Sequence, residues 1–166
     1  VNVGLPEIDE CEMMTNAVMG LQSILNTPLQ IDTSDPHVME KSLRLYNGKA
    51  MVNSVNGKEE SMNSVFPLVK KYGGVVVCLT LDENGIPETV DGRIAIAEKI
   101  IDRAKEFGIE KKDLVFDPLC MTISTNKDSA KITLQCVEKL TKDLGVKTIL
   151  GVSNVSFGLP NRELIN

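Results

Sequence analysis

The chain has 166 residues, 42% of them hydrophobic, and a formal net charge of -5. This is enough apolar material for one core, and the acidic balance disfavours binding to nucleic-acid phosphates. Aromatic residues make up 4% and tryptophan is absent, which excludes a base-stacking platform. The hydrophobic runs are too short to span a bilayer, and no basic start followed by an apolar stretch marks a secretory signal. The composition therefore predicts a cytoplasmic protein with neither a nucleic-acid nor a membrane partner.

Short β-branched runs alternate along the chain with longer stretches that have apolar residues every three or four positions. This alternation is typical of buried parallel strands connected by crossover helices, and it predicts an α/β fold. Six strands are predicted, at residues 1–3, 29–32, 50–53, 75–80, 114–116 and 148–150.

Four helices are predicted between these strands. The first begins at Asp35-Pro36, an acidic cap followed by proline, and the second covers residues 58–72, where Pro67 favours a kink or a later start. The third has apolar residues at helical spacing over 94–107 and ends at Gly108. The fourth covers 130–144 and ends before Gly145, so both glycines are expected to cap a helix end.

No linker or change of composition divides the chain, so a single unit over residues 1–166 is expected. A right-handed series of strand and helix units forms either a closed eight-stranded barrel or an open doubly wound sheet, and six strands leave a barrel two short. The chain starts inside an apolar run, and Glu163-Leu164-Ile165-Asn166 has the pattern of a helix start. Both features favour a piece of a longer protein.

The four cysteines are widely spaced, and there is only one histidine. These residues form no paired-cysteine or zinc-ligand motif, so no metal and no disulfide framework is predicted. The thiols are interpreted as small buried hydrophobes.

Four apolar runs end in a carboxylate or an amide: Asp32, Asn53, Asp117 and Asn154. Because parallel strands of a barrel end on one face, these side chains are expected to surround one small-molecule pocket. Carboxylates and amides, without a nucleophilic motif or a phosphate loop, favour a ring with adjacent N–H donors and acceptors. The alternative for Asp32 is that it only ties down its turn, and for Asp117 that its apolar loop is a buried turn. Asn56, in Asn56-Gly57, is interpreted as structural.

At the same strand ends the sequence resembles the pterin-binding family, most closely the methyltetrahydrofolate-binding domains of cobalamin-dependent methionine synthases and related methyltetrahydrofolate:corrinoid methyltransferases. The resemblance covers essentially the whole chain. It is carried by Val1-Asn2-Val3-Gly4, Asp32-Thr33-Ser34, Asn53-Ser54-Val55-Asn56-Gly57, Phe116-Asp117-Pro118-Leu119 and Gly151-Val152-Ser153-Asn154-Val155-Ser156-Phe157 with Asn161-Arg162. It implies a (β/α)8 barrel of the pterin-binding type, present here without its first and last strands.

The resemblance also implies roles for the site residues. Asp32, Asn53 and Asp117 would bind the pterin ring together with Asn154, which would lie near N5 as the catalytic residue. Arg162 would face the corrinoid or support the asparagine. The implied reaction is transfer of the N5 methyl group of 5-methyltetrahydrofolate to cobalt(I) of cobalamin, which a partner domain or protein carries, as part of methionine synthesis. A zinc site for homocysteine would belong to another module.

Two rival functions remain open. A dihydropteroate synthase would need cations near a diphosphate, where this chain has Ser153-Asn154-Val155 in place of a Ser-Arg-Lys sequence. A non-catalytic barrel that binds folate or docks a corrinoid domain is also compatible with the residues, since fold alone does not fix function. The sequence leaves a homodimer open.

Overall fold

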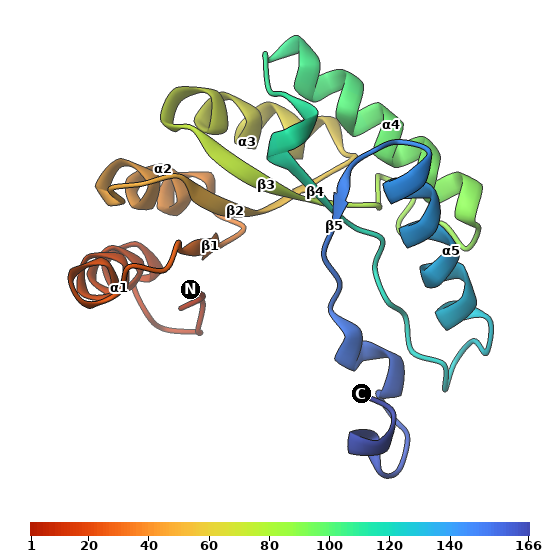
Figure 1. Ribbon diagram of the computed structural model, residues 1–166. Helices are drawn as coiled ribbons and strands as arrows, with labels where there is room; N and C mark the ends of the chain where they lie inside the picture. Colours follow the sequence, from red (N-terminus) through yellow and green to blue (C-terminus); the bar gives the residue numbers. More distant parts are fainter.

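The computed structural model describes residues 1–166 and has five parallel strands in one sheet, ordered β1-β2-β3-β4-β5 (Figure 1). The strands are β1 (Gln30–Asp32), β2 (Ala50–Asn56), β3 (Gly74–Leu79), β4 (Leu114–Asp117) and β5 (Lys147–Thr148). The helices are α1 (Glu10–Ile24), α2 (Pro36–Leu45), α3 (Glu59–Tyr72), α4 (Val90–Glu106) and α5 (Ser129–Lys142). Three short 3-10 helices are η1 (Lys111–Asp113), η2 (Val152–Ser156) and η3 (Arg162–Leu164).

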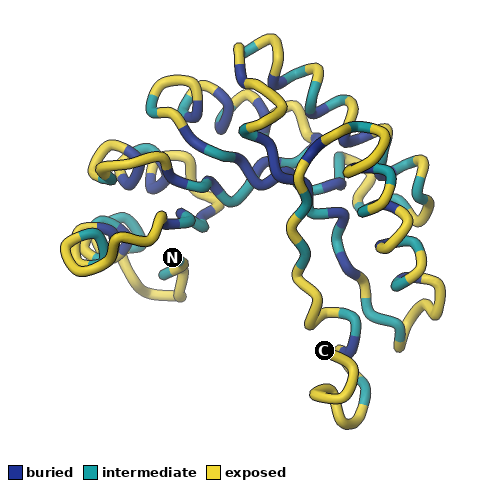
Figure 2. The backbone as a smooth tube through the Cα atoms, viewed as in Figure 1, coloured by how far each residue is buried: buried dark blue, intermediate teal, exposed yellow.

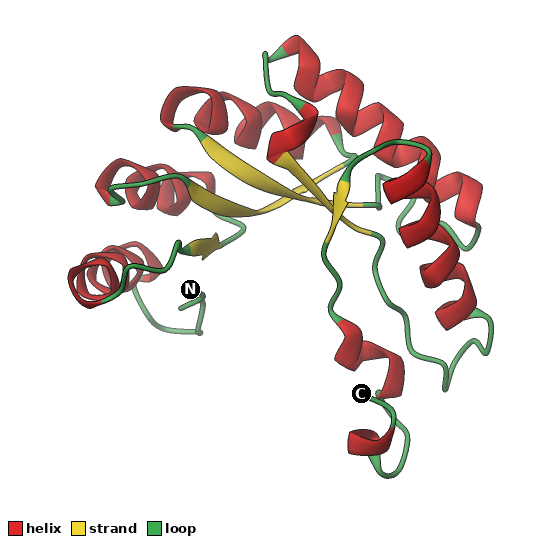
Figure 3. Ribbon diagram, viewed as in Figure 1, coloured by secondary structure: helices red, strands yellow, loops and turns green.

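The sheet curves into an arc with all five α-helices on its outer side, and both chain ends lie on the inner, open side (Figures 1 and 3). Helices α2 to α5 each connect one strand to the next neighbour in the sheet, as expected for repeated strand and helix units. The structure is thus part of a (β/α)8 barrel, and the predicted α/β class with an incomplete barrel is confirmed.

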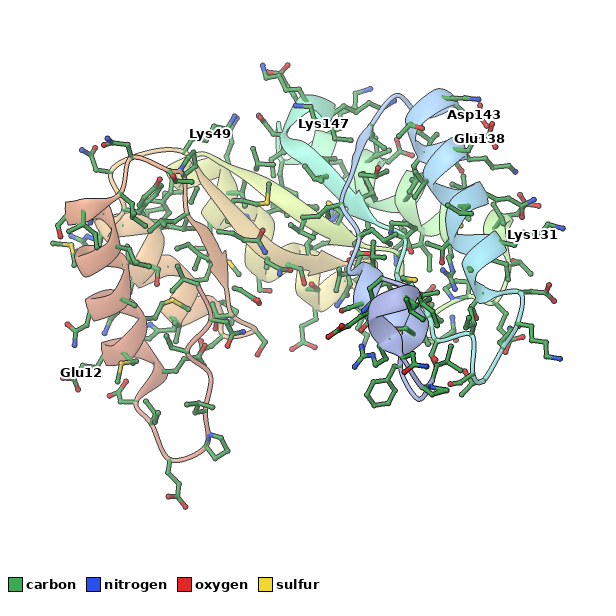
Figure 4. The ribbon with its side chains drawn as sticks, turned by 60° about the horizontal axis from the view of Figure 1, so that its bottom comes forward. Glu12, Lys49, Lys131, Glu138, Asp143 and Lys147 are labelled. Atoms are coloured by element: carbon green, nitrogen blue, oxygen red, sulfur yellow. The ribbon has the colours of Figure 1, made fainter.

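The core lies between the outer face of the sheet and the helices (Figure 2). Ile31, Val52, Val76 and Phe116 are fully buried there, each contributed by a different strand. Charged side chains such as Glu12 on α1 and Glu138 on α5 point away from the sheet (Figure 4). Burial of one apolar face per helix therefore fixes which face of the sheet remains for a ligand.

The three central predicted strands and β1 are present, with β2 three residues longer than the predicted 50–53 and the others shifted by one residue at one or both ends. The two outermost predicted strands differ more. Residues 1–3 form no strand, and only Val1 pairs with β1: its amino group donates to the Gln30 carbonyl at 2.6 Å and its carbonyl accepts from Asp32 N at 3.0 Å. Strand β5 covers Lys147–Thr148 instead of 148–150. Both segments lie at an open edge of the sheet, where a strand has one neighbour and its pairing ends early.

The helices follow the predicted pattern more closely. Asp35 caps α2 by accepting from His37 N. Helix α3 begins at Glu59, close to the predicted 58, and Pro67 lies inside it, so of the two alternatives for Pro67, a kink or a later start, the later start is wrong. Helix α1 is not among the predicted helices. None of the helices combines the length and apolar composition needed to cross a membrane.

Candidate functional site

Asp32, the last residue of β1, pairs in the parallel register with Asn53, which lies in the middle of β2 where the predicted strand ended. Successive side chains of a strand point to opposite faces, and the preceding residues Ile31 and Val52 are fully buried on the helix side. The Asp32 and Asn53 side chains, which are half-buried, therefore lie on the inner face of the arc. Directly after Asn53 the register between β2 and β3 shifts by one residue.

A cavity of about 560 Å³ opens where β1 and β2 end and α2 and α3 begin. Its volume lies within the range of about 300–1,000 Å³ common for small-molecule pockets. It is lined by mostly polar residues: Asp32, Thr33, Ser34, Pro36, Met39, Asn53, Ser54, Asn56, Lys58, Glu60, Ser61, Ser64 and Val65. Hydrogen-bond acceptors from two strand ends thus meet in one hollow.

Other side chains make the turn after Asp32. Thr33 Oγ1 accepts from Asp35 N at 3.1 Å and donates to Glu10 Oε1 at 2.5 Å. Asp35 in turn accepts from His37 N at 2.8 Å. These bonds leave the Asp32 carboxylate out of the turn, so the alternative that it only ties down the turn is not what the structure has. Asn56 does serve its turn by accepting from Lys58 N at 3.0 Å, as predicted.

Asp117 ends β4, two strands away from Asn53, and lies opposite Leu79 of β3. It follows the fully buried Phe116, so by alternation its side chain shares the inner face with Asp32 and Asn53. Its Oδ1 accepts from Leu119 N at 2.7 Å. Burial raises the pKa of the Asp117 carboxyl, while the backbone N–H groups of Leu119 and Gly151 act in the opposite direction.

The loop after Asp117 is fixed to the loop after β5. Thr122 Oγ1 and Ser124 Oγ donate to the Phe157 carbonyl at 2.6 and 3.0 Å, and Ile123 N donates to the Val155 carbonyl at 3.1 Å. Figure 3 shows the segments after β4 and β5 running from the sheet in the same direction, the second of them through the short helix η2. The site residues on these two loops therefore share one rigid support.

Asn154 lies in η2 and is exposed, and a Cβ placed on Gly151 would be 3.4 Å from Asn154 Nδ2. The Gly151 N–H counteracts the rise in the Asp117 pKa that burial causes, so the segment that carries Asn154 begins close to Asp117.

Arg162 holds the segment that carries Asn154. Arg162 Nη2 donates to the Ser153 carbonyl at 2.8 Å, and its Nε donates to the hydroxyl of the fully buried Ser156 at 3.1 Å. The Ser156 hydroxyl donates to Asn166 Oδ1 at 2.7 Å. The structure thus places the predicted residues in two groups: Asp32 with Asn53 at the cavity, and Asp117, Asn154 and Arg162 around the loops after β4 and β5.

Arg93 on α4 is a residue that the sequence reasoning missed. It is 3% exposed, and it donates to the carbonyls of Pro87, Pro118 and Leu119 at 2.7–2.9 Å. A signal for it exists in the sequence. Position 93 lies on the same helical stripe as the buried residues Ile96, Ala97, Ile100 and Ala104, where an arginine is out of place unless it has buried partners.

An α/β half-barrel with carboxylates and amides at its strand ends is the architecture of a small-molecule binding protein. The pattern that defines the family "Pterin binding enzyme" matches residues 4–164, and the chain belongs to this family. The family predicted from the motifs is thereby confirmed.

Curated relatives point to two activities. The chain is 31% identical to the methylcorrinoid:tetrahydrofolate methyltransferase of Eubacterium limosum, with 97% of this chain and 60% of that protein covered. It is 32% identical to the methionine synthase of Mycobacterium leprae, with 88% of this chain and 13% of that protein covered. The chain therefore spans only part of the length of these relatives.

Solved structures establish the fold likeness. Dihydropteroate synthase from Clostridium difficile matches 92% of this chain and 58% of its own with a TM-score of 0.70 and 24% identity. The enzyme from Yersinia pestis matches 91% of this chain and 57% of its own with a TM-score of 0.67 and 19% identity. At these identities the likeness concerns the barrel architecture alone.

Proposed function

We propose that residues 1–166 form one pterin-binding unit that binds 5-methyltetrahydrofolate and transfers its N5 methyl group to a corrinoid, as a methyltransferase of one-carbon metabolism and methionine synthesis. The observation that carries this proposal is the pairing of Asp32 and Asn53 in register at the mouth of a polar cavity, with Asp117 on the same face. The family and the names of two curated relatives support the choice of substrate.

The three residues Asp32, Asn53 and Asp117 suit a flat bicyclic ligand. Asn53 lies opposite Val77, and Asp117 lies two strands over and two residues further along, opposite Leu79. With strands about 4.8 Å apart and a rise of about 3.3 Å per residue, the two Cα atoms are about 12 Å apart on the sheet. Curvature of the arc brings the side chains nearer, so one ring can contact both. The carboxylates would accept from the amino-pyrimidine edge, and the Asn53 amide would meet a ring nitrogen.

Asn154 would act at N5, the atom that releases the methyl group. A tertiary amine leaves poorly unless N5 is protonated or strongly hydrogen-bonded as the bond to carbon breaks. The Asn154 amide holds no titratable proton, so its part is a hydrogen bond that strengthens as N5 becomes basic, with the proton delivered through water. Arg162, through its bond to the Ser153 carbonyl, would hold that amide in place.

The corrinoid would be the methyl acceptor, carried by a partner domain or protein, and it supplies a nucleophilic cobalt(I) when bound. Tetrahydrofolate is then the released product. The two relatives are named for folate-linked methyl transfer and for methionine synthesis, so both directions of transfer belong in the assay. Any homocysteine chemistry, with its zinc site, would reside in another module.

The test is calorimetric titration of the chain with 5-methyltetrahydrofolate, alongside methyl transfer between this folate and cob(I)alamin in both directions. Asp117→Asn removes the charge from a hydrogen bond worth about 1.5–3 kcal/mol, so the dissociation constant should rise about 10- to 150-fold. Asp102→Asn, on α4 and exposed, is the matched control and should bind normally. Asn154→Ala should slow transfer about 10- to 1,000-fold with a much smaller loss of binding. Asn16→Ala, exposed on α1, is its control.

Other outcomes would overturn the proposal in distinct ways. Condensation of a dihydropterin diphosphate with 4-aminobenzoate would establish a dihydropteroate synthase. Folate binding without transfer in either direction, unaffected by Asn154→Ala, would leave a scaffold that binds folate. No binding of the folate by the wild-type chain would remove the pterin proposal for this chain.

A further inference from the structure

Arg93 is a buried cation without a carboxylate partner. Its side chain is almost fully enclosed, and none of the ion pairs in the structure involves it. Its bonds go to three backbone carbonyls: Nε to Pro87 at 2.9 Å, and Nη1 to Pro118 and Leu119 at 2.7 and 2.8 Å. Removing a charge from water is costly, and here three hydrogen bonds to carbonyls offset that cost. The two bonds from Nη1 hold the loop after Asp117 in place.

The geometry leads directly to Asp117. The carbonyl of Leu119 accepts from Arg93, and the N–H of Leu119 donates to Asp117 Oδ1 at 2.7 Å. Leu119 has a φ of 65°, a left-handed conformation that residues with a Cβ rarely adopt. In this conformation one peptide unit presents its carbonyl to α4 and the preceding one its N–H to the site.

We propose that Arg93 is a positioning residue for the Asp117 carboxylate, acting by holding Leu119 in the left-handed conformation that aims its N–H at Asp117. Asp117 would then be fixed in direction before any ligand arrives. The consequence for pterin affinity rests on the proposed function; the effect on Asp117 itself does not.

The surroundings of Asp117 explain why the hydrogen bond from Leu119 N affects the pKa of its carboxyl. Burial raises the pKa of the Cys120 thiol on the same loop; the Asp117 charge raises it further, and the Arg93 charge lowers it. No charged side chain is among the groups that shift the pKa of Asp117 itself. The β5 loop contributes only the N–H of Gly151, and β3 contributes the apolar Leu79. Because burial raises the pKa of Asp117 and the Leu119 N–H counteracts this, loss of the Leu119 bond should raise the pKa further.

The first experiment needs no ligand. The Asp117 carboxyl is titrated by 13C NMR in the wild-type chain, in Arg93→Met and in Arg103→Met. Arg103 is the matched control, an arginine on the same helix whose bonds go to Asn63 and Glu106. The proposal expects an upward shift of the Asp117 pKa in Arg93→Met and none in Arg103→Met. An unchanged Asp117 titration in a folded Arg93→Met protein would overturn it.

If Arg93→Met does not fold, a second pair of variants tests whether Arg93 acts on Asp117 through Leu119. Arg93→Lys keeps the charge but replaces the planar guanidinium by one ammonium, which cannot reproduce the fork that serves three carbonyls. Leu119→Gly removes the penalty of the positive φ, because glycine adopts it without a Cβ clash. The pKa shift caused by Arg93→Lys should therefore shrink in the double variant Arg93→Lys/Leu119→Gly. An equal shift in both would show that Arg93 does not act through Leu119.

Binding completes the test. We expect Arg93→Lys to weaken 5-methyltetrahydrofolate binding about tenfold, of the order of one charge-assisted hydrogen bond, and Leu119→Gly to restore part of it. If the wild-type chain binds no folate, the proposed function fails while the titration still judges Arg93. If folate binds and Arg93→Lys changes neither affinity nor titration, the proposed function stands and the role of Arg93 is refuted.

Discussion

Arg162 Nη2 donates a 2.8 Å hydrogen bond to the carbonyl of Ser153, the residue directly before Asn154. The same guanidinium bonds the buried Ser156 hydroxyl and lies over the ring of Phe157, with 5.7 Å between its Cζ and the ring centroid. Arg162 therefore fixes both ends of the turn that carries Asn154. The residue proposed for the chemistry is exposed, and its position depends on this arginine rather than on packing.

Replacing Arg162 by Met should reduce methyl transfer more than pterin binding. The Asn154 turn would lose two hydrogen bonds, and small misplacement of a reacting group costs about 100-fold in rate. Asp32, Asn53 and Asp117 would keep their positions, so the dissociation constant of the folate should stay within a factor of about two, since distant, independent sites affect one another by only about 0.3–0.5 kcal/mol. Stopped-flow transfer and calorimetry on the same preparation measure the two quantities.

Arg44→Met is the control for Arg162→Met, since Arg44 is exposed on α2 and joins no ion pair. It should leave transfer unchanged. If Arg162→Met lost as much binding as transfer, the assigned role would be contradicted, because Arg162 would then be one of the residues that bind the pterin.

Pterin affinity should fall at acidic pH through the titration of Asp117. The grip requires the carboxylate, so affinity is present above the pKa of Asp117 and is lost as the pH falls through it. Because burial raises this pKa, the midpoint should lie above the ordinary aspartate value of about 3.9. Calorimetry at a series of pH values from about 4 to 7 measures how the dissociation constant depends on pH. The residual affinity of Asp117→Asn should lack this pH dependence, and a pH dependence that survives in this variant would assign the titration to another group.

The sequence predicts a site residue where a polar side chain follows an apolar strand run, because the strand pattern then fixes where that side chain lies. Asp32 and Asn53 end apolar runs of adjacent strands, so alternation and parallel register bring them together. Asp117 was located by the same pattern. Its direction depends on a left-handed Leu119 and a helix arginine 24 residues earlier, contacts that no local periodicity encodes.

The edges of the sheet were predicted least well. The runs at 1–3 and 148–150 have the composition of strands, yet in the first only Val1 bonds to β1. In the second, strand β5 ends at Thr148, and only Ile149 adds a backbone bond to β4, from its N to the Phe116 carbonyl at 3.0 Å. Strand formation needs a neighbour, and the neighbours of these segments are not set by their own residues. Helix α1 was missed, and its capping acid Asp9, which accepts from Glu12 N at 3.0 Å, could have indicated it.

Gly57→Ala should destabilise the fold, because this glycine sits where two elements approach closely. A Cβ at position 57 would lie 2.8 Å from Ile96 Cγ2 and 3.0 Å from the Leu81 carbonyl oxygen. Gly57 N already donates to that carbonyl at 2.8 Å, so the backbone cannot move away without losing a bond. Overpacking of this kind costs about 1–3 kcal/mol in the free energy of unfolding, which urea denaturation measures.

Gly20→Ala is the matched control for Gly57→Ala. Gly20 lies inside α1 with nothing within 4 Å of a new Cβ, so the same substitution should stabilise by about 0.5–1 kcal/mol. If both substitutions changed the free energy of unfolding equally, close packing around Gly57 would not be the cause of the expected loss of stability.

The four thiols should separate into one reactive group and three protected ones. Cys78, Cys120 and Cys136 are buried, and burial raises the pKa of each of these thiols, which reduces the thiolate that reacts. Cys11 on α1 is partly exposed. Titration of the native chain with a thiol-specific disulfide reagent near neutral pH should thus show one fast phase, and unfolding in urea should release the other three. Cys11→Ser should abolish the fast phase without changing the slow one. A fast phase that persists in Cys11→Ser would show that one of the three buried thiols becomes accessible in solution. If Cys120→Ser then removes it, the loop after Asp117 opens despite the bonds of Arg93 to Pro118 and Leu119.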